Sequence, residues 1–212
     1  MLLPLFYNLK GNMNKLIYSL CFLIMLIFTT AYAAPSQFVC DPKLKNCMEK
    51  ILQVKEARDL ISSIQKEGSL RIAVSDASES KQFGAFWDLD LRTVCVHLDS
   101  QVTEGEIIGS ILFELHNALV TSRYDQLDLL ARNGKINKAD YVKAYEQQEY
   151  YNSKNASAIA EKGISLGIFP HTARLPTYRN FEEHYHYQKI GGHSAYVARN
   201  YDMLMSESQR KT

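Results

Sequence analysis

One acidic residue, Glu114, lies within a long apolar stretch, IIGSILFELHNALVT, at residues 107–121. The apolar side chains of this stretch recur every three or four positions, which predicts a helix that buries one face in the core. Glu114 falls at the rim of that face, where partial removal from water raises the pKa of a carboxyl group and suits general-base chemistry. Glu114 is therefore the candidate catalytic residue, although an acid that hydrogen bonds to a neighbouring loop would occupy the same position.

Metal binding is a second chemistry to consider, because the segment EEHYHYQKIGGH near the C-terminus contains His184, His186 and His193. The aromatic spacing around these residues predicts a helix, on which residues two apart point in roughly opposite directions. His184 and His186 therefore cannot hold one ion together. His186 and His193 can still meet Glu114 in the folded protein, because site residues can come from distant elements.

The elements that position these residues predict an α+β fold, in which a small antiparallel sheet packs with several helices. Apolar and β-branched runs predict strands over residues 70–75, 83–87 and 92–98, of which the last two form a hairpin around an acidic turn. Helical spacing predicts helices over residues 47–66, 103–121, 124–132, 137–163, 177–190 and 193–205. Thr103 and Asn137 are the predicted N-caps of two of these helices, and Asp140 resembles the reciprocal acid of a capping box.

The order of elements around Glu114 resembles the zincin metallopeptidase scaffold over about residues 69–165. The matching features are a strand, a hairpin with the aromatic segment FGAFWD, the strand RTVCVHL and then the helix that carries the glutamate. In that family the helix carries His-Glu-x-x-His, whose histidines bind zinc and whose glutamate activates water. Aligned on Glu114, the two ligand positions are occupied by Phe113 and Asn117, neither of which is a good zinc ligand. His116 points away from Asn117 around the helix, so we expect a surface or capping role for it.

The glutamate-type zincins take a third zinc ligand from a later helix, and Glu146 or Glu149 in AYEQQEYY falls where that helix is expected. The resemblance therefore implies a pocket shared by Glu114, Asn117, Glu146 and Glu149. Because the histidine ligands are missing, it implies a non-catalytic binding or structural protein, a pseudoenzyme without a bound cofactor. The alternative is a metal-dependent, peptidase-like hydrolase in which Glu114 is the base and zinc is bound by atypical ligands drawn from Glu146, Glu149, His186 and His193.

The N-terminal segment has the order of a secretory signal peptide: Lys15, the apolar run 16–28, and then Ala31-Tyr32-Ala33. Cleavage after Ala33 predicts a secreted or periplasmic protein with no stable membrane span. An uncleaved anchor is the competing interpretation, because the run is only slightly shorter than the roughly 20 residues of a spanning helix. Translation can start at Met1 or at Met13.

The cysteines suggest one disulfide, because an oxidising compartment favours a bond between Cys40 and Cys47 across the short polar segment DPKLKN. The alternative is two exposed thiols on a flexible arm. Cys95 lies in a predicted strand and is expected to be a buried structural thiol, since free cysteine behaves as a small apolar residue.

Composition and charge indicate an ordinary folded domain. Hydrophobic residues make up 46% of the chain, and 24 basic residues against 23 acidic ones leave a net charge of +1, too little to recruit nucleic acid. The expected partner is a protein or peptide of unknown identity. The predicted organisation is a signal peptide (1–33), an N-terminal arm with the Cys40–Cys47 loop and a helix (34–68), a single α+β domain (69–205) and a polar tail (206–212).

Overall fold

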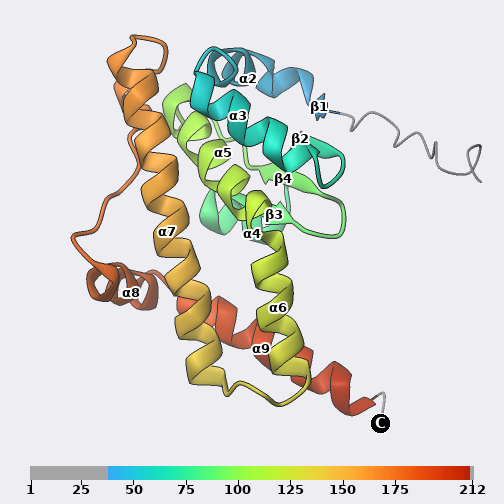
Figure 1. Ribbon diagram of the computed structural model, residues 1–212. Helices are drawn as coiled ribbons and strands as arrows, with labels where there is room; N and C mark the ends of the chain where they lie inside the picture. Colours follow the sequence, from blue (N-terminus) through green and yellow to red (C-terminus); the bar gives the residue numbers. More distant parts are fainter. Residues whose placement is uncertain (1–37, 211–212) are drawn as a thin grey trace, which may run out of the picture. The chain divides into compact units, whose positions relative to one another are not determined.

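The computed structural model describes residues 38–210 and has an α+β fold, which confirms the predicted fold class (Figure 1). Its sheet has the order β1-β2-β4-β3 and consists of β1 (Phe38–Cys40), β2 (Leu70–Val74), β3 (Ala85–Asp88) and β4 (Thr93–Val96). Within residues 38–210 the α-helices are α2 (Lys45–Ile51), α3 (Lys55–Gln65), α4 (Ser78–Phe83), α5 (Glu104–Leu119), α6 (Thr121–Arg132), α7 (Lys138–Ser165), α8 (Phe181–Ile190) and α9 (His193–Arg210). Two 3-10 turns complete the fold, η1 (Pro42–Leu44) and η2 (His171–Ala173).

The sheet is mixed, whereas the sequence predicted an antiparallel one. Strands β3 and β4 form the predicted antiparallel hairpin, in which Ala85 lies opposite Val96. The pairs β1–β2 and β2–β4 are parallel. The difference begins with β1, whose three residues are too few to show an alternating pattern. Helices α2 and α3 return the chain across the sheet after β1, so β2 runs in the same direction.

Helix boundaries differ from the predicted ones where tertiary packing competes with the local pattern. The predicted helix over residues 47–66 is divided into α2 and α3, because Val54 between them is fully buried with an extended backbone. The polar segment after β2, where the sequence predicted no element, contains the short helix α4. Helix α8 begins at Phe181 rather than near Thr177, because the side chain of Asn180 caps its first turn.

The helix that carries Glu114 begins where the capping pattern predicts. The hydroxyl of Thr103 accepts the backbone N–H of Glu106, and the Glu106 carboxylate accepts the backbone N–H of Thr103. Asn137 caps α7 in a similar way, since its side-chain oxygen accepts the N–H of Asp140 at 2.9 Å. These caps define where both helices start and therefore which residues face inward.

Buried apolar residues form two clusters within the described residues. The larger, called the main core here, joins the sheet to α2, α3, α5 and the C-terminal half of α7, and includes Leu112 and Ala160. The smaller, called the second core, joins α6, the start of α7 and α9 through Ala131, Tyr141, Val142, Val197 and Leu204.

Helix α7 takes part in both cores. Its 28 residues extend over roughly 42 Å. Tyr141 near its start belongs to the second core, and Ile159 in its C-terminal half belongs to the main core. Between these stretches the helix buries polar side chains, namely Glu146, Glu149, Asn152 and Ser153. A polar segment enclosed between two apolar cores is the natural candidate for a functional site.

The segment predicted as an N-terminal arm packs into the main core over its described part. Helices α2 and α3 bury Ile51 and Ile64 there, and both helices contact α5. The predicted signal peptide, with its alternative starts, lies outside the described residues. Within residues 38–210 no helix combines the length and the hydropathy that a membrane crossing requires. At the other end α9 continues to Arg210, so the described part of the predicted polar tail is helical.

The predicted Cys40–Cys47 disulfide is not formed, because Cys40, Cys47 and Cys95 are all free thiols. Cys40 ends β1, and its thiol donates to the carbonyl oxygen of Asp41 at 3.3 Å. Cys47 lies in the main core on α2. The residues between them fold into η1 and the start of α2 instead of an open loop, which turns Cys47 inward. Cys95 is buried in β4, as predicted.

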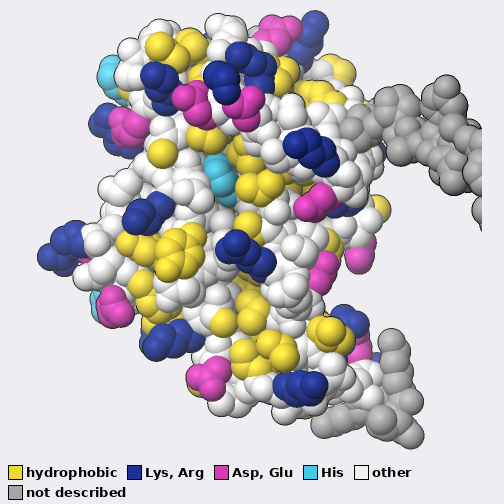
Figure 2. Space-filling model, viewed as in Figure 1, with side chains coloured by type: hydrophobic (Ala, Val, Ile, Leu, Met, Phe, Trp, Pro, Cys, Tyr) yellow, Lys and Arg dark blue, Asp and Glu magenta, His cyan; other side chains and the backbone are white. Residues whose placement is uncertain are grey.

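Charged side chains of both signs cover the surface. Figure 2 shows Lys and Arg interspersed with Asp and Glu on one face, without a large area of a single sign. Some of them form ion pairs between elements, such as Lys138 with Asp202. Exposed pairs of this kind contribute about 0–1 kcal/mol each, so the two apolar cores dominate the stability of the fold.

Two glycines on α5 allow η2 to approach that helix closely. A Cβ atom on Gly105 would lie 2.5 Å from the backbone nitrogen of Ala173, and one on Gly109 would lie 3.1 Å from the Ala173 carbonyl oxygen. This contact anchors the segment that follows α7. Pro176 and Tyr178, a few residues further on, line the candidate site.

We expect Gly105→Ala to lower the free energy of unfolding by about 1–3 kcal/mol. Alanine is favoured over glycine in a helix by roughly 1 kcal/mol, but here its methyl group would overlap the backbone of η2 and push the two elements apart. Urea denaturation followed by circular dichroism measures the change. Ser62→Ala, on the exposed face of α3, is the control and should not lower the stability. An equally stable Gly105→Ala variant would contradict the close contact.

Candidate functional site

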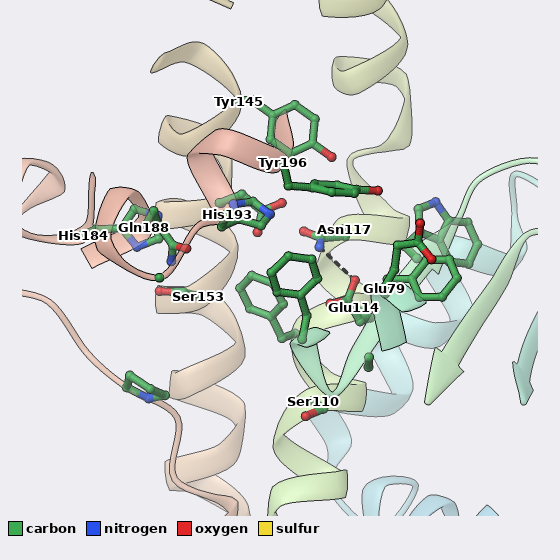
Figure 3. A pocket seen from close by; sticks show the side chains of 18 of the residues that line it. Glu79, Ser110, Glu114, Asn117, Tyr145, Ser153, His184, Gln188, His193 and Tyr196 are labelled. Atoms are coloured by element: carbon green, nitrogen blue, oxygen red, sulfur yellow. Dashed lines mark hydrogen bonds between the residues drawn. The ribbon is translucent and has the colours of Figure 1, made fainter. Parts of the chain in front are cut away.

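A cavity of about 370 Å³ lies beside the polar segment of α7 (Figure 3). Side chains from β3, α4, α5, α6, α7, α8 and α9 line it, together with the segment between η2 and α8. The lining includes the carboxylic acids Glu79, Glu114 and Glu149, several aromatic rings, and the imidazoles of His184 and His193. Small-molecule sites have volumes of about 300–1,000 Å³, so the cavity can hold a small ligand or one side chain of a partner.

Helix α5 contributes Phe113, Glu114 and Asn117 to this cavity. Asn117 Nδ2 donates to Glu114 Oε2 at 2.9 Å (Figure 3), and both side chains are buried. Glu114 therefore lies deeper than the rim position that the helical pattern predicted. The reason is that β3 and α7 both pack against α5.

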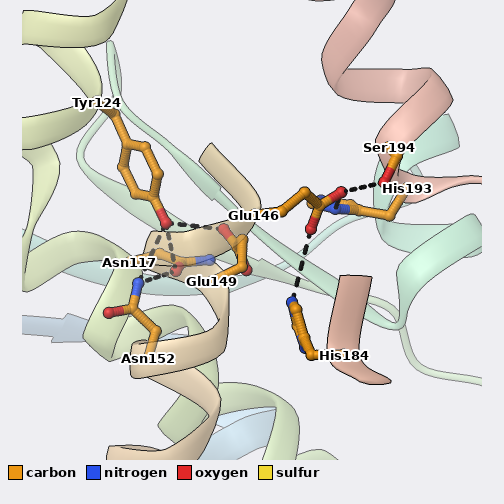
Figure 4. A network of polar contacts seen from close by, with 8 residues as sticks. All are labelled: Asn117, Tyr124, Glu146, Glu149, Asn152, His184, His193 and Ser194. Carbon is orange, nitrogen blue, oxygen red and sulfur yellow. Dashed lines mark hydrogen bonds and ion pairs between the residues drawn. The ribbon is translucent and has the colours of Figure 1, made fainter. Parts of the chain in front are cut away.

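Asn117 links Glu114 to a hydrogen-bond network that continues onto α6 and α7 (Figure 4). Its Oδ1 accepts from Asn152 Nδ2 at 2.7 Å and lies 3.2 Å from the hydroxyl oxygen of Tyr124. The same hydroxyl donates to Glu149 Oε1 at 2.8 Å. Both the oxygen and the nitrogen of the Asn117 amide are therefore engaged by neighbouring side chains.

Glu146, three residues before Glu149 on α7, is fully buried and contacts α8 and α9 (Figure 4). Its Oε1 accepts from Ser194 Oγ at 2.7 Å and from His193 Nδ1 at 3.1 Å. Its Oε2 lies 3.6 Å from His184 Nε2, which is too long for an ordinary hydrogen bond. This carboxylate thus holds α9 against α7 by two hydrogen bonds and lies next to His184 of α8.

The pKa values of the two acids that line the cavity from α5 and α7 are raised. Burial, followed by the nearby charge of Glu149, raises the pKa of Glu114 from 4.5 to about 8, although the hydrogen bond from Asn117 opposes the shift. Burial also raises the pKa of Glu149, against the opposing effects of His193 and the Tyr124 hydroxyl. At neutral pH Glu114 is therefore mostly protonated, a state that donates a hydrogen bond but is a weak general base.

Glu146 and His193 are shifted in the directions that favour a charged pair. Burial raises the pKa of Glu146, but the contacts with His184, His193 and Ser194 outweigh burial and lower it to about 2. Burial lowers the pKa of His193, but the hydrogen bond to Glu146 and the charge of Glu149 outweigh burial and raise it. These shifts favour an ionised Glu146 behind the cavity and a protonated His193 in its wall.

The candidate residues that the sequence suggests lie close together, with one exception. Glu114, Asn117, Glu149 and His193 line one cavity, and the hydrogen bond from His193 places Glu146 directly behind it. His186 is exposed on α8 and does not line the cavity.

His116, expected to be a surface or capping residue, is buried instead. Its Nδ1 donates to the carbonyl oxygen of Leu112 at 2.8 Å, and burial lowers its pKa. The expectation is wrong because α5 is covered on several sides at once, by β3, β4, α2, α3, α7 and η2. A single helical pattern cannot show that a helix is enclosed in this way.

No protein-family model, curated protein or solved structure matches the chain. The chemistry of the cavity is therefore inferred from its own side chains. Within residues 38–210, no group of three or more His, Cys, Asp or Glu side chains has the arrangement of a metal site.

Three further residues of the site, Trp87, Tyr124 and Asn152, do not stand out in the sequence. Asn152 follows Glu149 by three positions, as Glu149 follows Glu146, so helical spacing offers a signal that the three share a face. Trp87 lines the cavity from β3, and its indole Nε1 donates to Thr121 Oγ1 at 2.9 Å. Tyr124 has no comparable local signal, because its role depends on partners from two other helices.

We expect Glu114→Gln to gain stability relative to the wild type as the pH rises. The pKa of Glu114 in the folded protein, about 8, lies above its ordinary value of 4.5. The folded state therefore holds a proton that the unfolded state has lost between these values. The wild type consequently loses stability as the pH rises through this window, on the order of 1 kcal/mol per pH unit. The neutral amide of glutamine avoids this loss.

Urea denaturation at about pH 5 and about pH 8 measures the difference between the two proteins across most of that window. Glu182→Gln, which removes an exposed acid of α8, is the control. Its free energy of unfolding should differ from that of the wild type by nearly the same amount at both pH values. If the free energies of unfolding of Glu114→Gln and the wild type differed by the same amount at both pH values, the pKa of Glu114 would not be raised.

Proposed function

We propose that the protein is a non-catalytic binding protein on a zincin-like scaffold, with the cavity beside Glu114 as its binding site. The main support is Asn117, which occupies the position of the second zinc-binding histidine of the zincin motif. Its nitrogen donates to Glu114, and its oxygen accepts from Asn152 and lies 3.2 Å from the hydroxyl oxygen of Tyr124. A metal ligand needs a lone pair directed at the ion, and the hydrogen bonds already use this oxygen.

The remaining positions of the motif support the same proposal. Phe113, at the first histidine position, lines the cavity with an apolar ring that cannot bind zinc. Glu149, one of the two acids expected at the position of the third ligand, lines the same cavity and accepts a hydrogen bond from Tyr124. An apolar ring at Phe113 and hydrogen-bonded side chains at Asn117 and Glu149 thus occupy the three positions that bind the metal in the family. Such a site suits a scaffold used for binding.

The proposed location is secreted or periplasmic, on the strength of the signal-peptide order of residues 1–33. In that setting the ligand is an external molecule, most simply a peptide, a segment of a protein partner or a small molecule. The net charge of +1 argues against a nucleic-acid partner.

The second candidate is the metal-dependent hydrolase, and the observation that favours it is the grouping of acids and imidazoles. Glu149 and His193 line the cavity, with Glu146 behind them. These are three of the four atypical ligands that such an enzyme was expected to use. Helix α5 weighs against it, because Phe113 has no metal-binding atom and the amide of Asn117 is already hydrogen-bonded to Glu114 and Asn152.

Elemental analysis of the protein, purified without chelator or metal-affinity resin, tests the proposal. We expect the wild type to carry far less than one zinc ion per chain. We expect Phe113→His/Asn117→His to bind about one, because two imidazoles would join Glu149 in a three-ligand site. Circular dichroism confirms that each protein is folded.

The matched control is Phe113→Leu/Asn117→Leu, which changes the same two positions without adding a ligand and should bind no more zinc than the wild type. Stoichiometric zinc in the wild type would overturn the non-catalytic proposal in favour of the hydrolase. A folded double-histidine variant without zinc would argue against the zincin-like scaffold.

A further inference from the structure

We infer that the cavity binds an organic cation, namely an ammonium or guanidinium group carried by a small amine or by a basic side chain of a peptide. The inference rests on the proposed binding function and adds the chemical class of the ligand. Three features of the cavity support it: the charges of its walls, its aromatic rings and a buried imidazole without hydrogen-bond partners.

The ionisable side chains of the cavity walls include more acids than bases. Glu79, Glu114 and Glu149 line it, whereas its lining residues, all within the described part of the chain, include no Lys or Arg. The one base with a raised pKa on the wall, His193, is already paired with Glu146 through a 3.1 Å contact. An anionic ligand would face these carboxyl groups without a cationic partner, whereas a cation complements them.

Aromatic rings from several elements form much of the remaining wall. Trp87 of β3, Phe113 of α5, Tyr145 of α7 and Tyr196 of α9 all line the cavity, and Figure 3 shows Tyr145 and Tyr196 beside His193. The face of an aromatic ring carries partial negative charge and attracts ammonium and guanidinium groups. Rings combined with carboxyl groups therefore favour an organic cation over a hydrated inorganic one.

His184 provides an observation that does not depend on these charges. Its side chain is 1% exposed and lines the cavity, and neither ring nitrogen has a hydrogen-bond partner within the described residues. The nearby Glu146 Oε2 also has no hydrogen-bond partner there. Because His184 Nε2 faces this carboxylate at 3.6 Å, Nδ1 is the ring nitrogen left to accept a hydrogen bond, and buried polar groups are normally paired, so the site has an acceptor without a donor. Ammonium and guanidinium groups carry several donors and no acceptor, and either would supply an N–H to an accepting ring nitrogen of His184.

A bound cation also changes the ionisation of the acids. A positive charge near Glu114 and Glu149 favours their ionised forms, so binding releases protons and the affinity increases as the pH rises. The other titratable groups that act on Glu114 or line its cavity are Glu79 of α4, Cys95 of β4, Tyr124 of α6, Tyr145 of α7, Tyr178 before α8, His184 of α8, and His193 and Tyr196 of α9. Glu146 of α7 acts on Glu149. Burial raises the pKa of Cys95, Tyr124 and Tyr145, so these groups stay neutral while the acids titrate.

The fluorescence of Trp87, the single tryptophan of the chain, reports on occupation of the cavity. We would titrate the full protein with two matched pairs of probes: butylguanidine against butylurea, and the capped tripeptide Ala-Arg-Ala against Ala-citrulline-Ala. Each pair has nearly the same shape and differs in charge. We expect each cation to bind at least about tenfold more tightly than its neutral counterpart, and more tightly at pH 8 than at pH 6.

Variants then test which acids are responsible. At pH 8, Glu149→Gln and Glu114→Gln should each weaken binding of the cationic probes by about tenfold or more and affect the neutral probes much less. Glu182→Gln, an exposed acid of α8 outside the cavity, should have no effect. The two cavity variants are close in size to glutamate, and circular dichroism verifies that each is folded.

The two probe pairs also separate the two sources of the cation. Tighter binding of the arginine tripeptide assigns the ligand to a basic side chain of a peptide, and tighter binding of butylguanidine assigns it to a small free organic cation. Equal affinity for charged and neutral probes, stronger binding of the capped tripeptide Ala-Glu-Ala, or no binding of any probe would overturn the cation inference. None of these results changes the zinc content, so the proposed non-catalytic function stands or falls separately.

Discussion

Three carboxylic acids enclosed between two apolar cores are the constraint on which the rest of the structure depends. Glu114, Glu146 and Glu149 are all buried, and a buried ionised carboxylate without compensation is strongly unfavourable. Glu146 is compensated by hydrogen bonds from α9, and Glu149 by a hydrogen bond from Tyr124 of α6. Glu114 keeps its proton at neutral pH. The helices that surround the acids are therefore positioned by polar contacts as well as by apolar packing.

The length of α7 explains how such a site can exist in a chain of this size. Each part of the helix is anchored in a different core, so its polar middle is held in place although it packs few apolar side chains. Strand β3 and helix α5 approach this middle from the main core, while α8 and α9 close it from the other side. The cavity lies where the polar side chains of α7 separate the two apolar cores.

The same hydrogen bonds link stability to function. Asn117 donates a hydrogen bond to the buried acid Glu114 and accepts one from Asn152. The side chain at the second metal-ligand position therefore belongs to this hydrogen-bond network. His184 is the exception, because its ring is buried without hydrogen-bond partners in the described residues. The site therefore has a hydrogen-bond acceptor without a donor, next to acids and aromatic rings. A ligand that carries N–H donors suits such a site.

The sequence by itself determined the features that depend on neighbouring residues. The α+β class, the helix starts at Thr103 and Asn137, and the shared face of Glu146 and Glu149 follow from spacing and capping, which act within a few residues. Only the tertiary structure decided the parallel strand pairs, the free thiols, the burial of His116, and which of the candidate acids and imidazoles of α7, α8 and α9 meet Glu114 in one cavity. These features depend on contacts between residues far apart in the chain, and no local pattern records which distant surfaces will pack together.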